Sequence, residues 1–350
     1  MKRALTTLAV ALVVVLLGWN LLTAQRWPGT GPRPSTPPPS PRVGIHIANG
    51  RLVEAGGSDL VLRGVNHGYT WHPDRTSAFA DIKATGANGV RVALAMGQRW
   101  PANSERDVAY VVDQCKRNRL ICVLDAHDTV GFGVQSGAAT MAQAVDFWIR
   151  VRDAVAGQED YVILNIADEP FALYHSETWT VDTIDAVRRM RAGGFRHTLM
   201  VDAPDWGQDN SFVMRDHAGT VLAADPSGNL VFSVHMYGTF DTDAQVRAYL
   251  ASFAARRLAL VVGEFSSLHQ YGNPDEDAIM AQCQAFGIGY LGWSWSGNAG
   301  MGYLDMVVDF DARRLTAWGN RFVFGPNGIR ATARQAAVYG DVSRRNPAGS

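Results

Sequence analysis

Two glutamates each lie at the end of a short apolar run of the kind that forms buried strands. "VILNIADE" ends in Asp168 and Glu169, directly before Pro170, and "LALVVGEF" carries Glu264 near its end. An ionisable side chain beside a buried strand is costly unless it faces water or a partner. Two carboxyl groups about 5 to 5.5 Å apart can hydrolyse a glycosidic bond with retention, because one protonates the leaving oxygen while the other attacks the anomeric carbon. Either glutamate alone is equally compatible with a helix cap or a salt bridge, whereas the pair favours glycoside hydrolysis.

Further polar and aromatic residues follow other apolar runs of the sequence. They are His67, Arg91, His127, His235, Tyr237 and Trp293. The permanent charge of Arg91 would keep a neighbouring Glu264 ionised, while a less compensated Glu169 would hold a raised pKa and stay protonated. An ordinary buried ion pair is the structural alternative for Arg91, and a hydrogen-bonded core histidine is the alternative for His127.

Three tryptophans, Trp71, Trp206 and Trp295, lie in or beside the segments that follow these runs. The flat face of an indole can stack on a sugar ring, so each of them is a candidate substrate platform. Packing in the protein interior explains each tryptophan equally well when it is taken singly.

All these residues need a scaffold that brings the ends of distant strands together. Helix-like segments such as residues 104–118 and 243–257 alternate with eight apolar runs, which begin at Leu60, Gly89, Leu120, Val162, Leu199, Leu230, Leu258 and Gly289. The alternation predicts βα units with parallel buried strands. Eight units over about 300 residues predict an α/β fold of the (β/α)8 TIM barrel type, whose active sites lie at the C-terminal ends of the strands. Before the first run, an Asn49-Gly50 turn between alternating residues predicts a hairpin that closes the bottom of the barrel.

The N-terminal residues differ in composition from the predicted barrel. An apolar run over residues 4–24 follows Lys2 and Arg3, which predicts either a cleaved signal peptide or a membrane-anchoring helix over residues 1–25. Residues 26–42 are proline-rich and predict an extended linker. We therefore expect a single barrel domain over residues 43–342 and a flexible tail over residues 343–350. The body should be extracellular, either secreted or tethered to the outer face of the cytoplasmic membrane.

Charge and cysteine content exclude several classes of partner. The formal net charge of −1 is not that of a nucleic-acid-binding protein. The three cysteines, Cys115, Cys122 and Cys283, match no metal-binding spacing and allow at most one disulfide. We expect a monomer that requires no cofactor.

An acidic cluster near the C-terminal third of the chain, Asp275, Glu276 and Asp277, could hold a structural Ca²⁺ ion. The stronger interpretation is a helix start without a metal. In that interpretation Asn273 is the N-cap, Pro274 takes the first helical position, and the acids fill the first turn.

The chain resembles glycoside hydrolase family 5, and most closely the bacterial endo-β-1,4-mannanases of actinobacterial type. The resemblance runs from about residue 44 to residue 340 and includes "VLRGVNHGYTWHP", "NRLICVLDAHDT", "VILNIADEP", "VVGEF" and "GYLGWSWSGN". It implies that Glu169 is the acid/base and Glu264 the nucleophile, which Arg91 would orient. It also implies that His235 and Tyr237 support the reacting sugar, that Trp293 is the platform beneath it, and that the substrates are β-mannans.

The pair Asp168 and Glu169 departs from the resemblance at one position. The family has Asn-Glu-Pro there, and the Asn amide donates toward the reacting sugar, whereas an ionised Asp168 only accepts. We expect its charge to couple the titration of the three carboxyls and to raise at least one pKa. A protonated Asp168 would replace the Asn donor, so we expect a lower pH optimum than in an Asp168→Asn variant.

Two functions of different classes remain open from the sequence. The first is a retaining endo-β-1,4-mannanase acting on mannan, glucomannan or galactomannan, with a β-1,4-glucanase as the alternative within the family. The second is a catalytically impaired, carbohydrate-binding relative, which Asp168 would explain. The other residues that match the family favour the enzyme.

Overall fold

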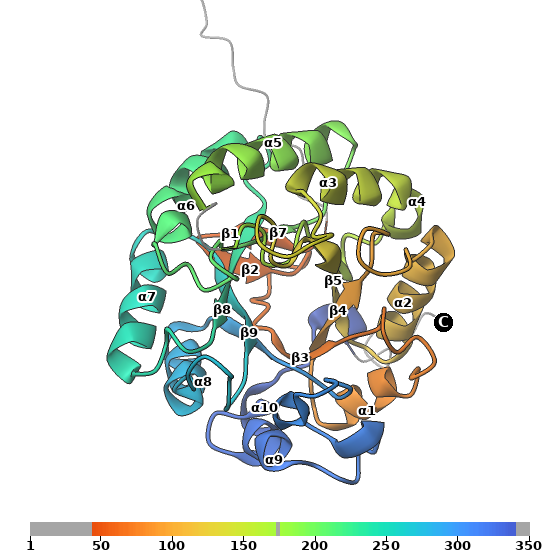
Figure 1. The fold of residues 1–350 in the computed structure, drawn as a ribbon, viewed down its shortest axis with the longest axis vertical. Coiled ribbons are helices and arrows are strands. Elements are labelled where there is room, and N and C mark those ends of the chain that lie inside the picture. Colours follow the sequence, from red (N-terminus) through yellow and green to blue (C-terminus); the bar gives the residue numbers. More distant parts are fainter. Residues whose placement is uncertain (1–43, 173–175, 341–350) are drawn as a thin grey trace, which may run out of the picture. The chain divides into compact units, whose positions relative to one another are not determined.

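The computed structural model describes residues 44–172 and 176–340 of the 350-residue chain, and these residues contain a closed barrel of parallel strands (Figure 1). The strand order around the barrel is β10-β3-β4-β5-β6-β7-β8-β9. The strands are β3 (Arg63–His67), β4 (Gly89–Leu94), β5 (Ile121–Ala126), β6 (Val162–Asn165), β7 (Leu199–Asp202), β8 (Leu230–Met236), β9 (Leu260–Phe265) and β10 (Gly289–Gly292). Each strand lies within one of the eight predicted apolar runs, and the predicted (β/α)8 barrel is confirmed.

Helices surround the barrel (Figure 1). They are α1 (Ala78–Ala84), α2 (Glu105–Arg117), α3 (Met141–Arg150), α4 (Arg152–Val155), α5 (Trp179–Ala192), α6 (Val213–Ala224), α7 (Asp243–Ala255), α8 (Glu276–Phe286), α9 (Ala317–Phe324) and α10 (Ile329–Thr332). Short 3₁₀ helices occupy residues 127–129, 176–178, 302–304, 308–310 and 337–339. In α2, Ser104 and Asp107 form a capping box, and the buried residues recur every three or four positions. Such a helix begins at a satisfied N-terminus and buries one face against the strands.

The side chains of the barrel strands alternate between two cores, as the two-residue period of a strand requires. Leu124 and Leu164 belong to the outer core beneath the helices, whereas Val123, Ile163 and Val231 belong to the core inside the barrel. Because neighbouring strands are parallel and paired in register, inward residues form layers. An apolar layer fills the lower barrel, and the next inward positions begin a polar layer.

The predicted hairpin lies at the bottom of the barrel. Strands β1 (His46–Ala48) and β2 (Arg51–Val53) pair antiparallel, and Asn49 and Gly50 both have positive φ, as a tight hairpin turn requires. Ile47 and Leu52 pack against the apolar layer inside the barrel. The expectation that the hairpin closes the bottom is confirmed.

The acidic cluster is a helix start, although the predicted cap was wrong. Asp275 is the N-cap of α8, and its carboxylate accepts from the Ala278 N–H at 2.9 Å. Pro274 therefore precedes the cap, and the amide oxygen of Asn273 accepts from the His269 N–H at 3.1 Å. Glu276 and Asp277 lie in the first turn, where acids favour the helix dipole. Within the described ranges, three groups of His, Asp and Glu side chains bring their ligand atoms within 4.8 Å of one another, and all three lie in the barrel mouth. Asp275, Glu276 and Asp277 belong to none of them.

The three cysteines are buried free thiols, and Sγ of Cys115 in α2 lies 2.9 Å from Sγ of Cys122 in β5. Any single disulfide between described cysteines would therefore join this pair. The predicted signal or anchor helix, the linker and the C-terminal tail lie outside the described residues. Within residues 44–172 and 176–340, no helix has the length and hydropathy of a membrane span.

Candidate active site

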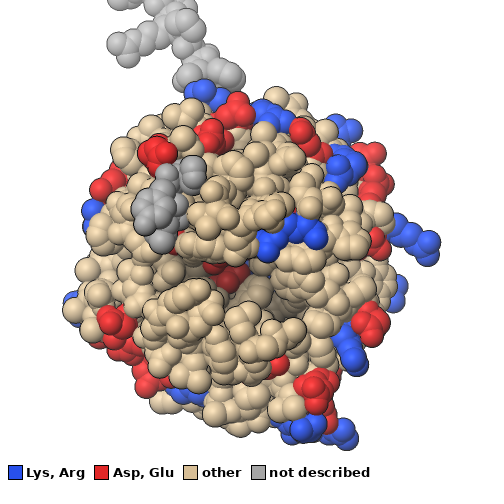
Figure 2. Space-filling model, viewed as in Figure 1, with Lys and Arg blue, Asp and Glu red and all other residues tan. Residues whose placement is uncertain are grey.

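A cavity of about 750 Å³ opens at the C-terminal ends of the strands. Figure 2 shows a hollow on this face with acidic atoms at its floor. The cavity is lined by predicted site residues from six strands or the loops after them: His127, Asp168, Glu169, Trp206, Tyr237, Glu264 and Trp293. Strand ends far apart in the sequence therefore supply one site.

Glu264 points into the barrel because β9 contains one extra residue. Along β8 and β9, Val234 pairs with Val262 but His235 pairs with Glu264, so Gly263 is a bulge. A Cβ on Gly263 would collide with the Ser233 hydroxyl, which explains why only glycine fits here. The bulge shifts the alternation by one position and turns the Glu264 carboxylate inward.

Glu169 lies four residues beyond the end of β6, in a short loop held by hydrogen bonds. The Asp168 N–H donates to the Ala126 carbonyl at 3.1 Å, and the Thr129 hydroxyl donates to the Asp168 carbonyl at 2.5 Å. The Glu169 N–H donates to Oδ2 of Asp202 at 3.3 Å, and the Glu169 backbone has a positive φ. A side chain fixed in this way is positioned as firmly as one on a strand.

The carboxyl groups of Glu169 and Glu264 face each other beside His235. One oxygen of each lies within 4.8 Å of the other and of a His235 ring nitrogen, which is close to the separation found in retaining glycosidases. His235 Nδ1 lies 2.8 Å from Oε1 of Glu169 and 3.6 Å from Oε2 of Glu264. The pair therefore has the geometry that the sequence led us to expect.

The two carboxyls have different partners. Glu264 accepts from Nη1 of Arg91 at 2.6 Å and from the Tyr237 hydroxyl at 2.8 Å. Burial raises the pKa of Glu264, while His235 and Arg91 lower it and Asp168 raises it. Burial raises the pKa of Glu169 to about 8, although the hydrogen bond from His235 opposes this shift. At neutral pH Glu169 is thus protonated, as an acid catalyst must be.

Arg91 is buried at the centre of the polar layer, in the middle of β4 and not at its end as the sequence analysis assumed. It forms ion pairs with four carboxylates, at 2.5 Å to Asp168, 2.6 Å to Glu264, 3.2 Å to Asp125 and 3.3 Å to Asp202. Four acids around one guanidinium offset the large cost of burying its charge.

Both oxygens of Asp168 face cationic side chains, although the hydrogen bond of His127 Nδ1 goes to Oδ2 of Asp125 at 2.7 Å. Oδ1 accepts from Arg91, and Oδ2 lies 3.2 Å from Nδ1 of His127. Burial lowers the pKa of His127, but Asp168 and Asp125 raise it to about 9. The histidine therefore carries a proton, so two cationic side chains lie against the oxygens of Asp168. That a protonated Asp168 donates a hydrogen bond toward the sugar stays a prediction.

The sequence analysis missed several members of the polar layer. They are Asn66, Asp125, Asn165 and Asp202, which all hydrogen-bond or pair with Arg91. The two-residue alternation of the strands could have identified them. Each lies two or four positions beyond an apolar residue that points into the barrel, such as Val123, Ile163 or Met200.

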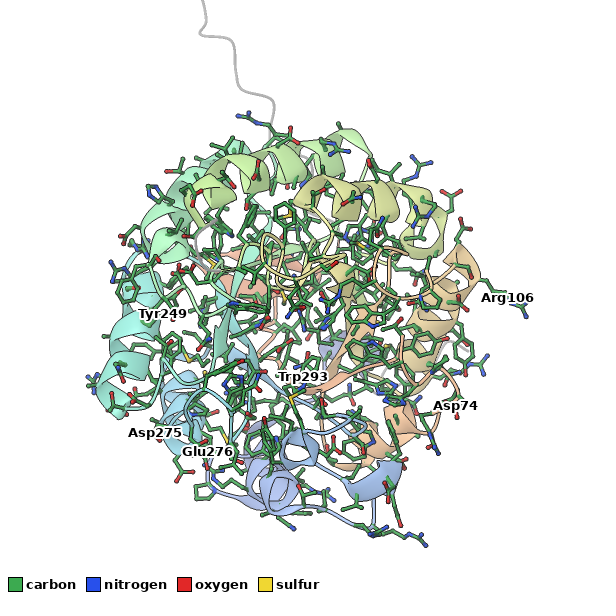
Figure 3. The ribbon with its side chains drawn as sticks, in the orientation of Figure 1. Asp74, Arg106, Tyr249, Asp275, Glu276 and Trp293 are labelled. Carbon is green, nitrogen blue, oxygen red and sulfur yellow. The ribbon has the colours of Figure 1, made fainter. Side chains whose placement is uncertain are left out.

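The predicted aromatic platforms divide into two groups. Trp293 lies near the centre of the barrel mouth (Figure 3), and its indole stacks on His127 at 5.6 Å. Trp206 also lines the cavity, and Trp71 lies behind the cavity wall, edge-on to His127 at 5.0 Å. Trp295 is wrong as a platform because only 1% of it is exposed.

His67 does not join the site either. Its ring is buried between Phe79 and Phe310, and neither nitrogen has a hydrogen-bond partner among the described residues. Burial lowers its pKa to about 3. His67 is therefore neutral and belongs to the packing around the barrel mouth.

Comparison with known proteins agrees with this geometry. Residues 53–299 match the family described as cellulase (glycosyl hydrolase family 5). A mannan endo-1,4-beta-mannosidase of Streptomyces lividans is 51% identical over 97% of this chain and 88% of its own length. One from Cellvibrio japonicus is 47% identical over 86% of this chain and 70% of its own length. The structure of a beta-mannanase from Streptomyces thermolilacinus with mannohexaose has a TM-score of 0.84 at 50% identity, covering 86% of this chain and 99% of that one.

Proposed function

The chain belongs to glycosyl hydrolase family 5, and we propose that it is a retaining endo-β-1,4-mannanase that cleaves internal bonds of mannan, glucomannan or galactomannan. The observation that carries this proposal is the opposed pair of Glu169 and Glu264, one oxygen of each lying within 4.8 Å of the other. The named activity of the similar proteins supports mannan as the substrate class.

In the first step Glu264 attacks the anomeric carbon while Glu169 gives its proton to the leaving glycosidic oxygen. Arg91 and Tyr237, which bind separate oxygens of Glu264, orient the attacking carboxylate and hold its charge. The product of this step is a covalent glycosyl-enzyme and a free chain end.

In the second step the ionised Glu169 takes a proton from water, and the water oxygen displaces Glu264 from the anomeric carbon. His235, which lies 2.8 Å from Glu169, would stabilise the carboxylate that exists between the two steps. Trp293 and Trp206 line the cavity and offer aromatic faces to the sugar rings. The carboxyl pair and water supply the nucleophile, the acid and the base, so the reaction needs no cofactor.

The binding-only alternative is not favoured. Asp168 replaces an amide, but its charge is compensated by Arg91 and His127 and leaves both catalytic carboxyls in place. The glucanase alternative is not favoured either, since the two relatives described above are both named as mannan hydrolases.

We further propose that the enzyme acts as a monomer outside the cytoplasm. The support is the apolar run over residues 4–24 behind Lys2 and Arg3, which has the length of a membrane span or a long signal sequence. Fractionation of the producing cells separates the two forms. Full-length protein in the membrane fraction supports the anchor, and a soluble product beginning near residue 25 supports the signal peptide.

The activity is tested by measuring reducing-sugar release from mannan, glucomannan and cellulose with purified protein and with a Glu264→Gln variant. We expect release from the two mannans by the parent only. The stereochemistry of the first product, followed by NMR, should show the β-anomer. Release by the Glu264→Gln variant at the parental rate, or an α-anomer as first product, would overturn the proposed mechanism.

A further inference from the structure

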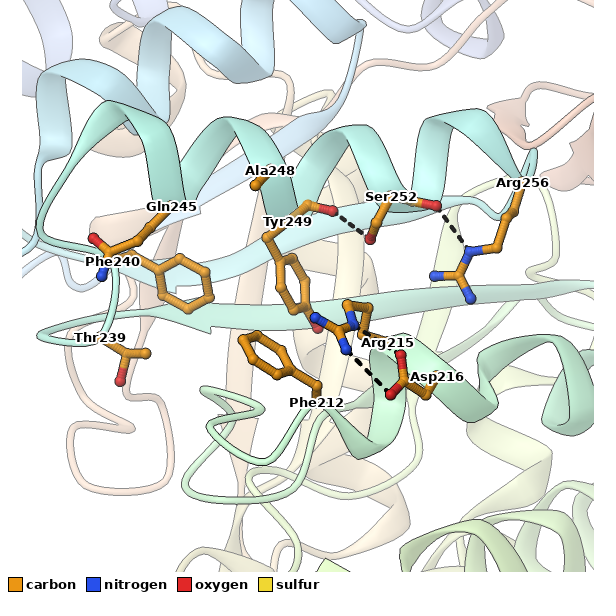
Figure 4. Close-up of a pocket in the computed structure, with 10 residues that line it drawn as sticks. All are labelled: Phe212, Arg215, Asp216, Thr239, Phe240, Gln245, Ala248, Tyr249, Ser252 and Arg256. Atoms are coloured by element: carbon orange, nitrogen blue, oxygen red, sulfur yellow. Dashed lines mark hydrogen bonds and ion pairs between the residues drawn. The ribbon is translucent and has the colours of Figure 1, made fainter.

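A second concave surface lies on the flank of the barrel, between α6 and α7 (Figure 4). It is a groove of about 610 Å³ between Phe212 and Arg215 on one side and Gln245, Tyr249 and Arg256 on the other. We call it the α6–α7 groove. Helices α5 and α6, and α7 and α8, pack closely together, whereas α6 and α7 make far less contact with each other, so the ring of helices is open here.

The floor of the α6–α7 groove is rigid. The Tyr249 hydroxyl donates to Oδ2 of the buried Asp209 at 2.7 Å, and the Asp209 carboxylate also accepts from the N–H groups of Met214 and Arg215 at 2.8 Å. The tyrosine ring and the first turn of α6 are thereby held together. A ligand would meet a preformed surface, which lowers the entropic cost of binding.

The lining combines aromatic carbon with flexible polar groups. Phe212 remains 40% exposed whereas Tyr249 is buried, and the guanidinium of Arg215 lies over the Phe212 ring at 3.8 Å (Figure 4). Arg215 is already paired with Asp216 at 2.8 Å, so its charge is compensated and an anionic ligand gains little. Arg256, whose Nε donates to the Ser252 carbonyl at 2.8 Å, lies at the end of the groove opposite Thr239 (Figure 4). The exposed Phe212 ring with the neutral groups of Gln245 and Thr239 suits a neutral, polyhydroxylated ligand.

The groove and the catalytic cavity share one lining residue. Thr239 lines both, and its hydroxyl lies 3.2 Å from Oε1 of Gln208 and 2.5 Å from Oδ1 of Asn210, two residues that line the catalytic cavity. Phe212 follows Asn210 by two positions. A chain that leaves the catalytic cavity over Thr239 therefore reaches Phe212 next.

The backbone of Phe212 is unusual. Its φ of 57° and ψ of 26° are left-handed, and it is the N-cap of α6 without making a side-chain cap hydrogen bond. Glycine or asparagine would suit this position better, because a bulky residue is strained in the left-handed region. The left-handed backbone at this exposed aromatic residue favours a functional role for the Phe212 ring.

We propose that the α6–α7 groove binds the distal sugars of the same neutral polysaccharide whose reacting sugars occupy the catalytic cavity. The inference rests on the proposed function, since it requires a polymeric substrate. The groove would then increase affinity for long chains and leave the hydrolysis of short oligosaccharides unchanged.

The test compares Phe212→Gly, which keeps the left-handed backbone and removes the ring, with the parent and with Phe212→Trp. Phe324→Ala, at an exposed phenylalanine of α9, is the matched control. We expect Phe212→Gly to lower kcat/KM on soluble glucomannan roughly five- to tenfold through KM, with kcat/KM on mannotriose unchanged. Phe212→Trp and Phe324→Ala should retain the parental values.

Binding is measured separately by affinity electrophoresis in gels containing glucomannan, with Glu264→Gln in every variant to prevent digestion. Phe212→Gly should be retarded less than Phe212→Trp. Equal retardation of the two, or equal losses on polymer and trisaccharide, would overturn the role of the groove while leaving the proposed function intact. A parent that neither hydrolyses nor is retarded by mannans would instead refute the proposed function.

Discussion

Replacing Asp168 with Asn removes one negative charge from the active site and changes little else in size. Asp168 contributes to the raised pKa of both Glu169 and Glu264. Arg91 would keep its ion pairs with Asp125, Asp202 and Glu264, so the variant should fold. The substitution therefore isolates the electrostatic effect of one carboxylate on the catalytic pair.

The magnitude follows from the Coulomb energy in a partly polarisable site. Two unit charges roughly 6 to 8 Å apart interact by about 2 to 3 kcal/mol at an effective dielectric constant near 20, which corresponds to about 1.5 to 2 pKa units. Arg91 and His127 compensate part of the Asp168 charge, so we expect a shift of about one unit.

The sign of the shift is the same for both catalytic groups. Glu169 must be protonated, and its pKa of about 8 sets the alkaline limb of the activity profile. Glu264 must be ionised, and its pKa sets the acidic limb. Removing a charge that raises both values moves both limbs to lower pH. This reverses the expectation from the sequence, which assumed that Asp168 could donate a proton.

The assay is kcat/KM for mannohexaose measured across about pH 4 to 10 for the parent, Asp168→Asn and the control Asp113→Asn on the outer surface of α2. We expect an alkaline limb about one unit lower in Asp168→Asn and no change in the control. The restored amide donor should also raise the maximal rate by about tenfold. An alkaline limb that stays in place or moves to higher pH would refute the electrostatic reasoning.

Three further predictions concern the catalytic pair and its neighbour. Glu264→Gln should lower kcat by roughly 10³-fold or more and leave mannohexaose binding, measured by calorimetry, within about twofold; a smaller loss of rate would remove Glu264 as the nucleophile. An unfolded glutamate releases its proton near pH 4.3, whereas Glu169 in the folded protein holds its proton up to about pH 8. The free energy of unfolding that this group contributes therefore falls as pH rises between these two values. Glu169→Gln should therefore gain roughly 4 kcal/mol of unfolding free energy relative to the parent at pH 8 but less than about 1 kcal/mol at pH 4.5. Equal differences in denaturant titrations at both pH values would contradict this. Tyr237→Phe removes one hydrogen bond to Glu264 and should lower kcat about tenfold with KM unchanged. A change in KM alone would instead show that Tyr237 acts in substrate binding.

The barrel, its strands and its bottom hairpin were predictable because each depends on local patterns. Apolar runs separated by amphipathic helices specify parallel βα units, and Asn49-Gly50 specifies a hairpin turn. The placement of Glu169 and Glu264 in one cavity followed from the same topology, since all strands of a barrel end on one face.

The parts that could not be predicted depend on contacts between distant segments. The bulge at Gly263 is visible only in the pairing of β9 with β8. The partners of Asp168 are Arg91 on β4 and His127 after β5. No local sequence pattern predicts that these two distant side chains compensate the charge of Asp168. The predicted N-cap of α8 was two residues too early, because Asn273 and Asp275 are equally good capping residues. The side-chain oxygen of Asn273 accepts from the His269 N–H instead, so Asp275 caps the helix.

The bulge makes the orientation of Glu264 depend on how β9 pairs with β8. If β9 kept its length but paired with β8 without the bulge, Gly263 would lie opposite His235 and the side chains would follow a regular two-residue period. The Glu264 carboxylate would then face the dry layer beneath the helices, and Arg91 would lose one of its four acids. Loss of the bulge would therefore eliminate catalysis before it eliminates folding, so redesign of this barrel has to preserve the irregular pairing at Gly263 as strictly as the identity of Glu264.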